Sequence, residues 1–362
     1  MENPLKYFAK LQDPRVERTR EHLLEEILLL TIAAVLSGAS GWNEIEDYGR
    51  TKIDWFKSFL TLPSGIPSHD TFNRVFSALD PEELERGFVA WVASLAKLTA
   101  GEVVGIDGKM LRGTRGKKAI VHMVSAWANS NNLVLAQRRV DDKSNEITAI
   151  PKLLKILELS GTIVTIDAIG CQRSIAQQIV EYKADYILAV KENQGHLLED
   201  IQDSFRMLPA DSVAEEIDCG HGRVERRTCS VIGDLSLLEN SSQWIGLQGL
   251  VRIQAERFHK ATGKTENETR YYITSLPPQA SKLNSAIRQH WGIENKLHWV
   301  LDVAFGEDLC RKRAGHAAQN FSLINRLVLN LLKQDKTSKL GIHGKRLKAG
   351  WDNNYLLRVL GN

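Results

Sequence analysis

Two aspartates occupy equivalent places at the ends of apolar runs. Asp107 follows the run VVGI and precedes Gly108, whereas Asp167 follows the run TIVTI and precedes Ala-Ile-Gly. A charged residue that interrupts a buried strand usually lies at its C-terminal end, where open α/β sheets build their sites. Either aspartate alone could equally be a turn or cap residue. Together, about 60 residues apart in the same context, they indicate a shared site.

A third carboxylate, Glu294, lies in the motif HWGIENKLHW on a predicted helix over residues 281–305. A helix packed on a sheet can direct one carboxylate toward the strand ends. Three carboxylates in one site repel one another unless cations bind, and oxygen ligands suit Mg²⁺ or Mn²⁺. Two such ions can activate the attacking oxygen and stabilise the leaving oxygen in phosphodiester transfer. Asp107, Asp167 and Glu294 are therefore the predicted catalytic and metal-binding residues.

The helix that carries Glu294 offers other interpretations. His290, Glu294 and His298 are spaced four residues apart and share one helix face, which could bind zinc. The HExxH spacing of zinc proteases is absent, so hydrogen bonding, DNA contact or a structural role is favoured for both histidines. Trp291 and Trp299 are interpreted as core residues, with base stacking near a cleaved DNA end as the alternative.

Nucleotide and thiol chemistry are not indicated. Gly105, Gly108 and Gly113 do not form a GxGxxG fingerprint, and no GxxxxGK[ST] motif occurs, so no nucleotide cofactor is expected. The four cysteines form no CxxC pair, which fits a reducing cytoplasm. The longest apolar stretch, residues 27–36, is half of the roughly 20 residues that a membrane span needs, so no membrane partner is expected.

Charge is distributed unevenly along the chain. The net charge is +3, but residues 311–362 contain 11 Lys or Arg and 2 Asp or Glu, which leaves +9 there and −6 in residues 1–310. A basic C-terminal region on an acidic body suggests a polyanionic partner, although a solvated tail is the alternative.

The pattern of elements predicts an α/β protein. Residues 1–97 have helical periodicity and form a predicted helical N-terminal domain. In residues 98–310, strand-like runs at 103–111, 117–129 and 132–142 precede alternating helices and strands, which predicts a mixed sheet with flanking helices. Residues 212–277 switch to short strands and are predicted to be a β-rich insertion. Residues 311–362 are predicted to form a basic helical tail.

Several long motifs resemble insertion-sequence transposases of the DDE superfamily, and most of all the H-repeat-associated subgroup. The resemblance spans nearly the whole chain and is carried by GIDGKMLRG, DDKSNEITAIPKLL, TIDAIGCQ, YILAVKENQG and HWGIENKLHWVLDVAFGED. It implies an RNase H-like fold and a DDE site at Asp107, Asp167 and Glu294. It also implies two Mg²⁺ or Mn²⁺ ions, double-stranded DNA with terminal inverted repeats, a homodimer on that DNA, and a place in the bacterial cytoplasm or nucleoid.

One departure from the wider superfamily limits this inference. Many relatives carry Tyr-x2-Arg-x3-Glu-x6-Lys around the glutamate, whereas the flanking positions here are Ile287, His290 and Leu301. Roles of that tyrosine, arginine and lysine are therefore not transferred. A DNA-binding relative without catalysis, and a metal-dependent nuclease without strand transfer, are the alternative functions.

Basic side chains in and near the motifs are candidates for phosphate contact. On the helix after residue 70, Thr71, Asn73 and Arg74 are candidates for reading base edges in the major groove. The predicted DNA-binding residues are Lys109, Arg112, Lys191, Arg223, Arg227, Arg288, His298, Lys345, Arg346 and Lys348.

Overall fold

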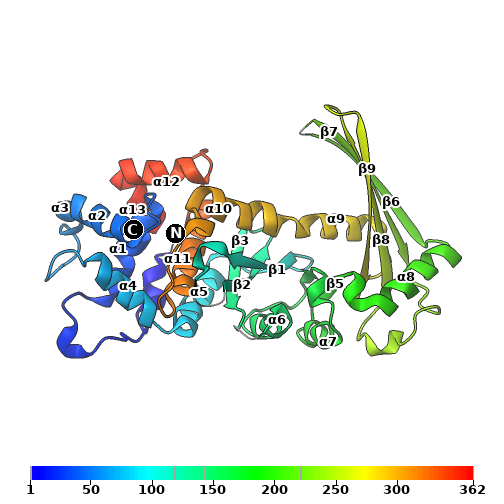
Figure 1. Cartoon of the computed structure of the whole chain (residues 1–362), viewed down its shortest axis with the longest axis horizontal. Coiled ribbons are helices and arrows are strands. Elements are labelled where there is room, and N and C mark those ends of the chain that lie inside the picture. Colours follow the sequence, from blue (N-terminus) through cyan, green and yellow to red (C-terminus); the bar gives the residue numbers. More distant parts are fainter. Residues whose placement is uncertain (1, 117–119, 142–143, 221, 362) are drawn as a thin grey trace.

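The computed structural model of the chain describes residues 2–116, 120–141, 144–220 and 222–361. Helices gather at one end of an elongated molecule, a mixed sheet lies in the middle, and long strands form the other end (Figure 1). The predicted strand runs over 117–129 and 132–142 reach outside the described residues at 117–119 and at 142. None of the helices in the described residues combines the length and apolar character needed to cross a bilayer.

In residues 2–97 the regular elements are helices. Helix α1 is buried along nearly its whole length, as expected of a helix that is apolar on every side. The Ser68 hydroxyl accepts a hydrogen bond from the Thr71 amide and caps α4, and the Asp80 carboxylate accepts one from the Glu82 amide and caps α5. The helices are α1 (Leu24–Leu36), α2 (Trp42–Thr51), α3 (Ile53–Phe56), α4 (His69–Ala78) and α5 (Pro81–Leu95).

The central sheet begins with five strands in the order β3-β2-β1-β4-β5. Strands β1, β4 and β5 are parallel, while β2 runs antiparallel to β1 and β3. Helices α6 and α7 cover one face and α9 covers the other (Figure 1), which confirms the predicted RNase H-like mixed sheet. The elements are β1 (Val103–Leu111), β2 (Val121–Ala128), β3 (Leu133–Arg139), α6 (Glu146–Leu154), β4 (Ile163–Ile166), α7 (Arg173–Glu181), β5 (Asp185–Val190) and α9 (Ala280–His290).

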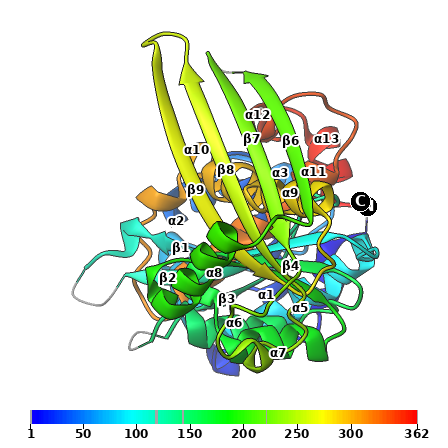
Figure 2. The ribbon, with the colours of Figure 1, turned by 90° about the vertical axis from the view of Figure 1, so that its right-hand side faces the viewer.

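The β-rich insertion continues the central sheet. After α8 (Gly195–Met207), antiparallel strands β6 to β9 follow, and β9 pairs with β5, so that the described residues form one sheet of nine strands. The far halves of these strands project beyond the rest of the molecule (Figure 2). The strands are β6 (Ser212–Gly220), β7 (Arg223–Ile232), β8 (Gly249–His259) and β9 (Lys264–Thr274).

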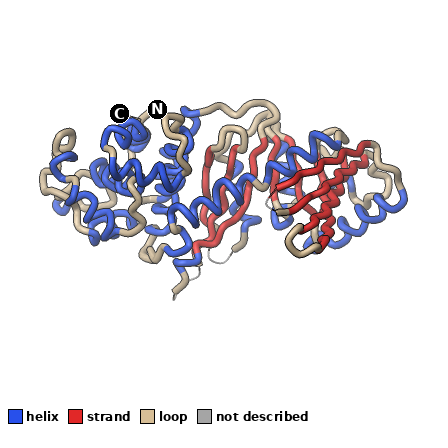
Figure 3. The backbone as a smooth tube through the Cα atoms, turned by 90° about the horizontal axis from the view of Figure 1, so that it is seen from above, coloured by secondary structure: helices blue, strands red, loops and turns tan. Residues whose placement is uncertain are grey.

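The C-terminal helices pack with the N-terminal helices in one lobe. Helix α11 is buried over most of its length and contacts α1, α4, α5 and β3. The Asn320 side-chain amide donates to the carbonyls of Phe76 and Leu79 and joins α11 to the end of α4. Both chain ends lie at this lobe (Figure 3). The helices are α10 (Trp299–Phe305), α11 (Ala317–Gln334), α12 (Ile342–Trp351) and α13 (Asn353–Leu360).

Candidate active site at the ends of two parallel strands

The sheet register sets Asp107 and Asp167 side by side. Strands β1 and β4 are parallel and pair Ile106 with Ile166, and the two aspartates are the next residues along. Side chains alternate between the faces of a strand, so Asp107 points to the same face as Gly105. A Cβ on Gly105 would lie 3.6 Å from His290 Nδ1, so that face looks toward α9. The structure therefore brings the two predicted aspartates together beneath that helix.

Glu294 begins a π-helix over Glu294–His298, between α9 and α10. Short π-helical turns are rare and occur frequently at functional sites. Glu294 and Asp167 line one cavity of about 450 Å³, together with Lys191, Arg270 and His290. The third predicted carboxylate thus faces the same opening as the second.

Burial and neighbouring charges shift the pKa values of these carboxyl groups. Burial, together with the negative charges of Glu146, Glu294 and Asp167, raises the pKa of Asp107 to about 7. Burial, followed by the charge of Asp167, also raises the pKa of Glu294. Burial opposes ionisation of Asp167 too, but the Ala168 amide and the Lys191 ammonium outweigh it and lower the pKa of Asp167. The Lys191 Nζ lies 3.3 Å from Asp167 Oδ1.

Asp107, Asp167 and Glu294 offer the oxygen ligands that Mg²⁺ prefers, although they are not arranged around a single ion position. Within the described ranges, no group of three or more His, Cys, Asp and Glu side chains is placed to hold an ion. Asp107, Asp167 and Glu294 nevertheless act on each other electrostatically, and all offer oxygen donors. A divalent cation would relieve the repulsion that raises the pKa of Asp107. The residues present fit such an ion, provided that Glu294 approaches the aspartates when it binds.

The two histidines of the motif serve different strands. His290 Nδ1 lies 2.9 Å from Thr165 Oγ1, and His298 Nδ1 lies 3.4 Å from Asp107 Oδ2. Burial lowers the pKa of His290 to about 4. Burial, followed by the charges of Arg326 and Lys109, lowers the pKa of His298 to about 3. Both rings are therefore neutral. Because each histidine is directed to its own strand, the zinc alternative on this helix finds no support.

The two tryptophans lie outside the apolar core. Trp299 is 62% exposed, so the predicted core role is wrong for it. Trp291 is partly buried, and the Arg270 guanidinium lies 4.7 Å from the centre of its ring. Both Trp291 and Arg270 line the cavity that contains Asp167 and Glu294.

A second cavity, of about 670 Å³, adjoins the first between α9 and strands β7 to β9. Its charged lining is mostly basic, with Glu225 as the acidic member. Some of these cations are already paired, since Arg257 lies 2.9 Å from Glu268. The predicted residues Arg223, Arg227 and Arg288 line this cavity, which we call the basic cavity. Its basic residues are Arg223, Arg227, Arg257, Arg270, Arg288 and Lys296. Arg227 is buried and donates to Asn284 Oδ1 at 2.8 Å, and Arg288 forms an ion pair with Asp218.

Three of these cations were not predicted from the sequence. Arg257 and Arg270 lie on long strands of the insertion, and Lys296 lies within the π-helix. Neither Arg257 nor Arg270 belongs to an alternating basic row, since Ala255 and Glu268 precede them by two residues, so strand alternation gave no signal for them. The pairing of β8 with β9 brings both arginines into the cavity beside α9.

The structure corrects the predicted phosphate contacts of Lys345 and Arg346. Both side chains are buried. The Lys345 ammonium donates to the carbonyls of Leu332 and Asp335 at 2.8 and 2.6 Å. The Arg346 guanidinium donates to the Val35 and Ala39 carbonyls at 2.8 and 3.0 Å. These cations satisfy helix C-termini inside the helical lobe, so they are not open to a phosphate.

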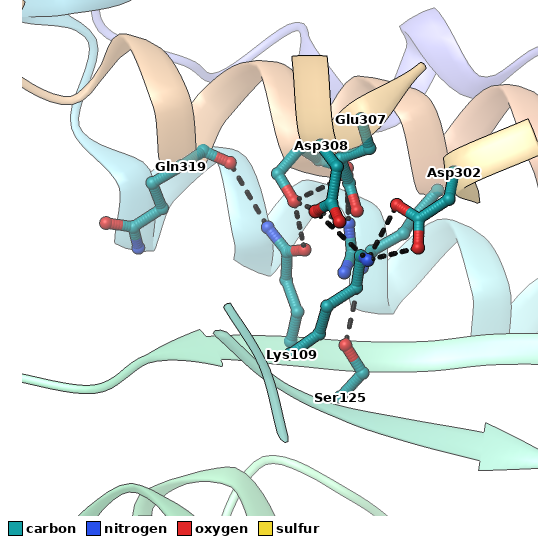
Figure 4. A network of polar contacts seen from close by, with 9 residues as sticks. Lys109, Ser125, Asp302, Glu307, Asp308 and Gln319 are labelled. Carbon is teal, nitrogen blue, oxygen red and sulfur yellow. Dashed lines mark hydrogen bonds and ion pairs between the residues drawn. The ribbon is translucent and has the colours of Figure 1, made fainter. Parts of the chain in front are cut away.

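The remaining predicted cations differ in exposure. Lys348 is partly buried over the Tyr355 ring, whereas Arg112 is 81% exposed beside Asp308. Lys109 is buried and forms an ion pair with Asp302 (Figure 4). A free surface for phosphate therefore remains at Arg112 but not at Lys109.

The predicted DNA-reading helix lies beside the start of the basic C-terminal region. Asn73 lines a cavity of about 600 Å³ together with Arg311 and Arg313. Between these arginines, Lys312 turns inward, donates to the Ser40 carbonyl and lies over the ring of Trp42. Its burial anchors the segment, so that Arg311 and Arg313 face outward near α4.

Comparison with known proteins places two family models on this chain. The model described as "Transposase DDE domain" matches residues 99–331, and the one described as "DDE_Tnp_1-associated" matches residues 5–92. "H repeat-associated putative transposase YhhI" of Escherichia coli (strain K12) is 40% identical over 98% of this chain and 97% of its own length. "Putative transposase YncI" of Escherichia coli O157:H7 is 40% identical over 98% of this chain and 94% of its own length. "Inactive transposase YbfQ" of strain K12 is 55% identical over 56 residues, which are 16% of this chain and 67% of that protein.

Proposed function

This chain belongs to the family of transposases that share the transposase DDE domain, and we propose that it cleaves and joins DNA strands at insertion-sequence ends. The observation that carries this proposal is the parallel register of β1 and β4, which sets Asp107 beside Asp167. Glu294 faces the same opening from a π-helix, and the three carboxylates repel one another. Such a group is suited to cations and to phosphodiester chemistry.

The three carboxylates, His298 and Lys191 have different roles in the proposed reaction. Asp107, Asp167 and Glu294 would hold Mg²⁺ or Mn²⁺, which supplies activation of the attacking oxygen and stabilisation of the leaving oxygen when bound. The neutral ring of His298 lies against Asp107 and orients its carboxylate. Lys191 balances the charge of Asp167 when the site is empty of substrate.

The basic cavity is the proposed path of the DNA backbone. It adjoins the cavity that Asp167 and Glu294 line, since Arg270 and Trp291 line both cavities. Arginine guanidinium groups bind phosphate oxygens with two parallel hydrogen bonds. The substrate would be double-stranded DNA with terminal inverted repeats, bound by two copies of the chain. Arg112 beside Asp308, and Arg311 and Arg313 near α4, would add contacts.

The test uses near-isosteric substitutions that remove charge. Asp107→Asn, Asp167→Asn and Glu294→Gln should each abolish Mg²⁺-dependent cleavage of a labelled inverted-repeat duplex, because each removes one metal ligand. Binding of that duplex in a gel-shift assay should persist, because the basic cavity is intact. The exposed acids Asp54 and Glu199 provide matched controls; Asp54→Asn and Glu199→Gln should cleave like the parent. Parental cleavage by a site variant would remove that residue from the catalytic set.

A second candidate is a DNA-binding relative that lacks catalysis. Two observations favour it: the described carboxylates do not form a closed metal cluster, and one short similarity is to a relative named inactive. The same assay separates the candidates, since this one predicts duplex binding without cleavage by the parent. Cleaved but unjoined ends would instead indicate a nuclease.

A further inference from the structure

The segment that carries Glu294 is attached at both ends to the strands that carry the aspartates. Upstream of it, His290 contacts Thr165 on β4, and Gly105 on β1 leaves room for the end of α9. Downstream of it, Asp302 of α10 is joined to Lys109 of β1. The π-helix is therefore held between two attachments, and its position relative to the aspartates depends on both.

The downstream attachment is a buried ion pair. Lys109 follows Asp107 by two residues, so its side chain points to the same face of the sheet. Its Nζ lies 2.7 Å from each Asp302 carboxylate oxygen and 3.4 Å from Asp308 Oδ1 (Figure 4). Charge-assisted bonds of this length are among the stronger polar contacts in proteins. The ammonium is thus committed to α10 and to the turn that follows it.

A second buried link runs parallel to the first. Ser125 is the register partner of Asp107 on the neighbouring strand β2. The fully buried Arg326 places its Nε 3.4 Å from Ser125 Oγ and its Nη1 2.9 Å from Glu307 Oε1 (Figure 4). Glu307 follows α10, so both links join the neighbourhood of Asp107 to the 302–308 segment.

We propose that Lys109, through its ion pair with Asp302, is a positioning residue that sets Glu294 against Asp107. The inference rests on the proposed function, because it concerns the carboxylates of that site. Losing either partner would leave the other charge buried without its counterion. Segment 302–308 would then separate from β1, and Glu294 would lose its fixed approach to the aspartates. Exposed Lys155, at the end of α6, lies outside this segment and serves as the matched cation.

The test compares Lys109→Gln, Asp302→Asn, the double variant and Lys155→Gln. Amide hydrogen exchange over residues 291–305, without metal or DNA, should be faster in the first three and parental in Lys155→Gln. In Lys109→Gln, Asp302→Asn and the double variant, the Mn²⁺ affinity measured by calorimetry and the cleavage rate should each fall about tenfold to a hundredfold. The double variant should lose no more Mn²⁺ affinity or cleavage rate than the more affected single variant, because both single variants break the same contact. Duplex affinity and its salt dependence should stay parental for Lys109→Gln.

Three outcomes would overturn the proposal. Weaker duplex binding with a flatter salt dependence in Lys109→Gln would make Lys109 a phosphate contact. Parental hydrogen exchange and Mn²⁺ affinity in both single variants would remove any positioning role. So would a double variant whose loss of Mn²⁺ affinity equals the sum of the losses in the two single variants. If Lys109→Gln does not fold, Asp302→Asn and the charge exchange Lys109→Asp with Asp302→Lys carry the same readouts. Because hydrogen exchange needs no catalysis, parental cleavage by Asp107→Asn would refute the proposed function without deciding the positioning role.

Discussion

Replacing Asp107 by Asn should abolish cleavage and yet stabilise the metal-free protein. The Asp107 carboxyl is 22% exposed and its pKa is raised to about 7 by burial, and then by neighbouring carboxylates. In the unfolded chain the pKa is 3.8. The folded state therefore binds this proton more tightly, and stability falls as pH rises from about 4 to about 7. The side-chain amide that Asp107→Asn introduces is neutral in both states and avoids that loss.

The magnitude follows from the two pKa values. At about 1.4 kcal/mol for each tenfold step in acidity, a pKa of about 7 in place of 3.8 corresponds to about 4 kcal/mol at pH 8. An unfolding entropy of about 2.1 cal/mol/K per residue converts this into a Tm rise of roughly 5 °C for a chain of 362 residues. At pH 5 the folded Asp107 stays protonated, so the difference in Tm between Asp107→Asn and the parent should shrink to less than half.

The assay is thermal unfolding in EDTA at pH 8 and pH 5, followed by addition of Mg²⁺. Metal should raise the Tm of the parent and leave Asp107→Asn nearly unchanged, because binding stabilises only a protein with intact ligands. Asp167→Asn is the matched control, since the pKa of Asp167 is lowered and its charge is already stabilised. Equal Tm values for the parent and Asp107→Asn at pH 8 would refute the reasoning from carboxylate crowding.

Three further tests address other parts of the structure. Replacing Arg223 and Arg288 with Gln should flatten the log–log salt dependence of duplex binding by about 0.9 for each lost phosphate contact; a parental slope in filter binding would exclude the basic cavity. Lys345→Met and Arg346→Met should each lower stability to urea by about 1–3 kcal/mol, because buried carbonyls lose their donors, while an altered salt dependence would restore the phosphate role. Deleting residues 1–97 should give insoluble protein, because α11 packs against α1, α4 and α5; a soluble fragment with a cooperative melt would contradict this.

Local sequence signals were enough to predict most elements and the positions of the aspartates. Helix starts at Ser68 and Asp80 depend on contacts within three residues, which is the range over which a local sequence pattern acts. Strand ends at Asp107 and Asp167 are marked by a charge that interrupts an apolar run. Since parallel strands end at one edge of a sheet, those positions already implied a shared site.

Which cations are free, by contrast, depends on the tertiary fold. Lys109, Lys345 and Arg346 are ordinary basic residues in the sequence, yet all three are buried. Their partners are distant: Asp302 lies 193 residues from Lys109, and the Val35 carbonyl lies 311 residues from Arg346. The π-helix at Glu294 likewise lies between attachments to β4 and β1 that no local pattern encodes. Local periodicity and capping act over a few residues, whereas the burial of a charge depends on which distant carboxylate or carbonyl the fold places beside it.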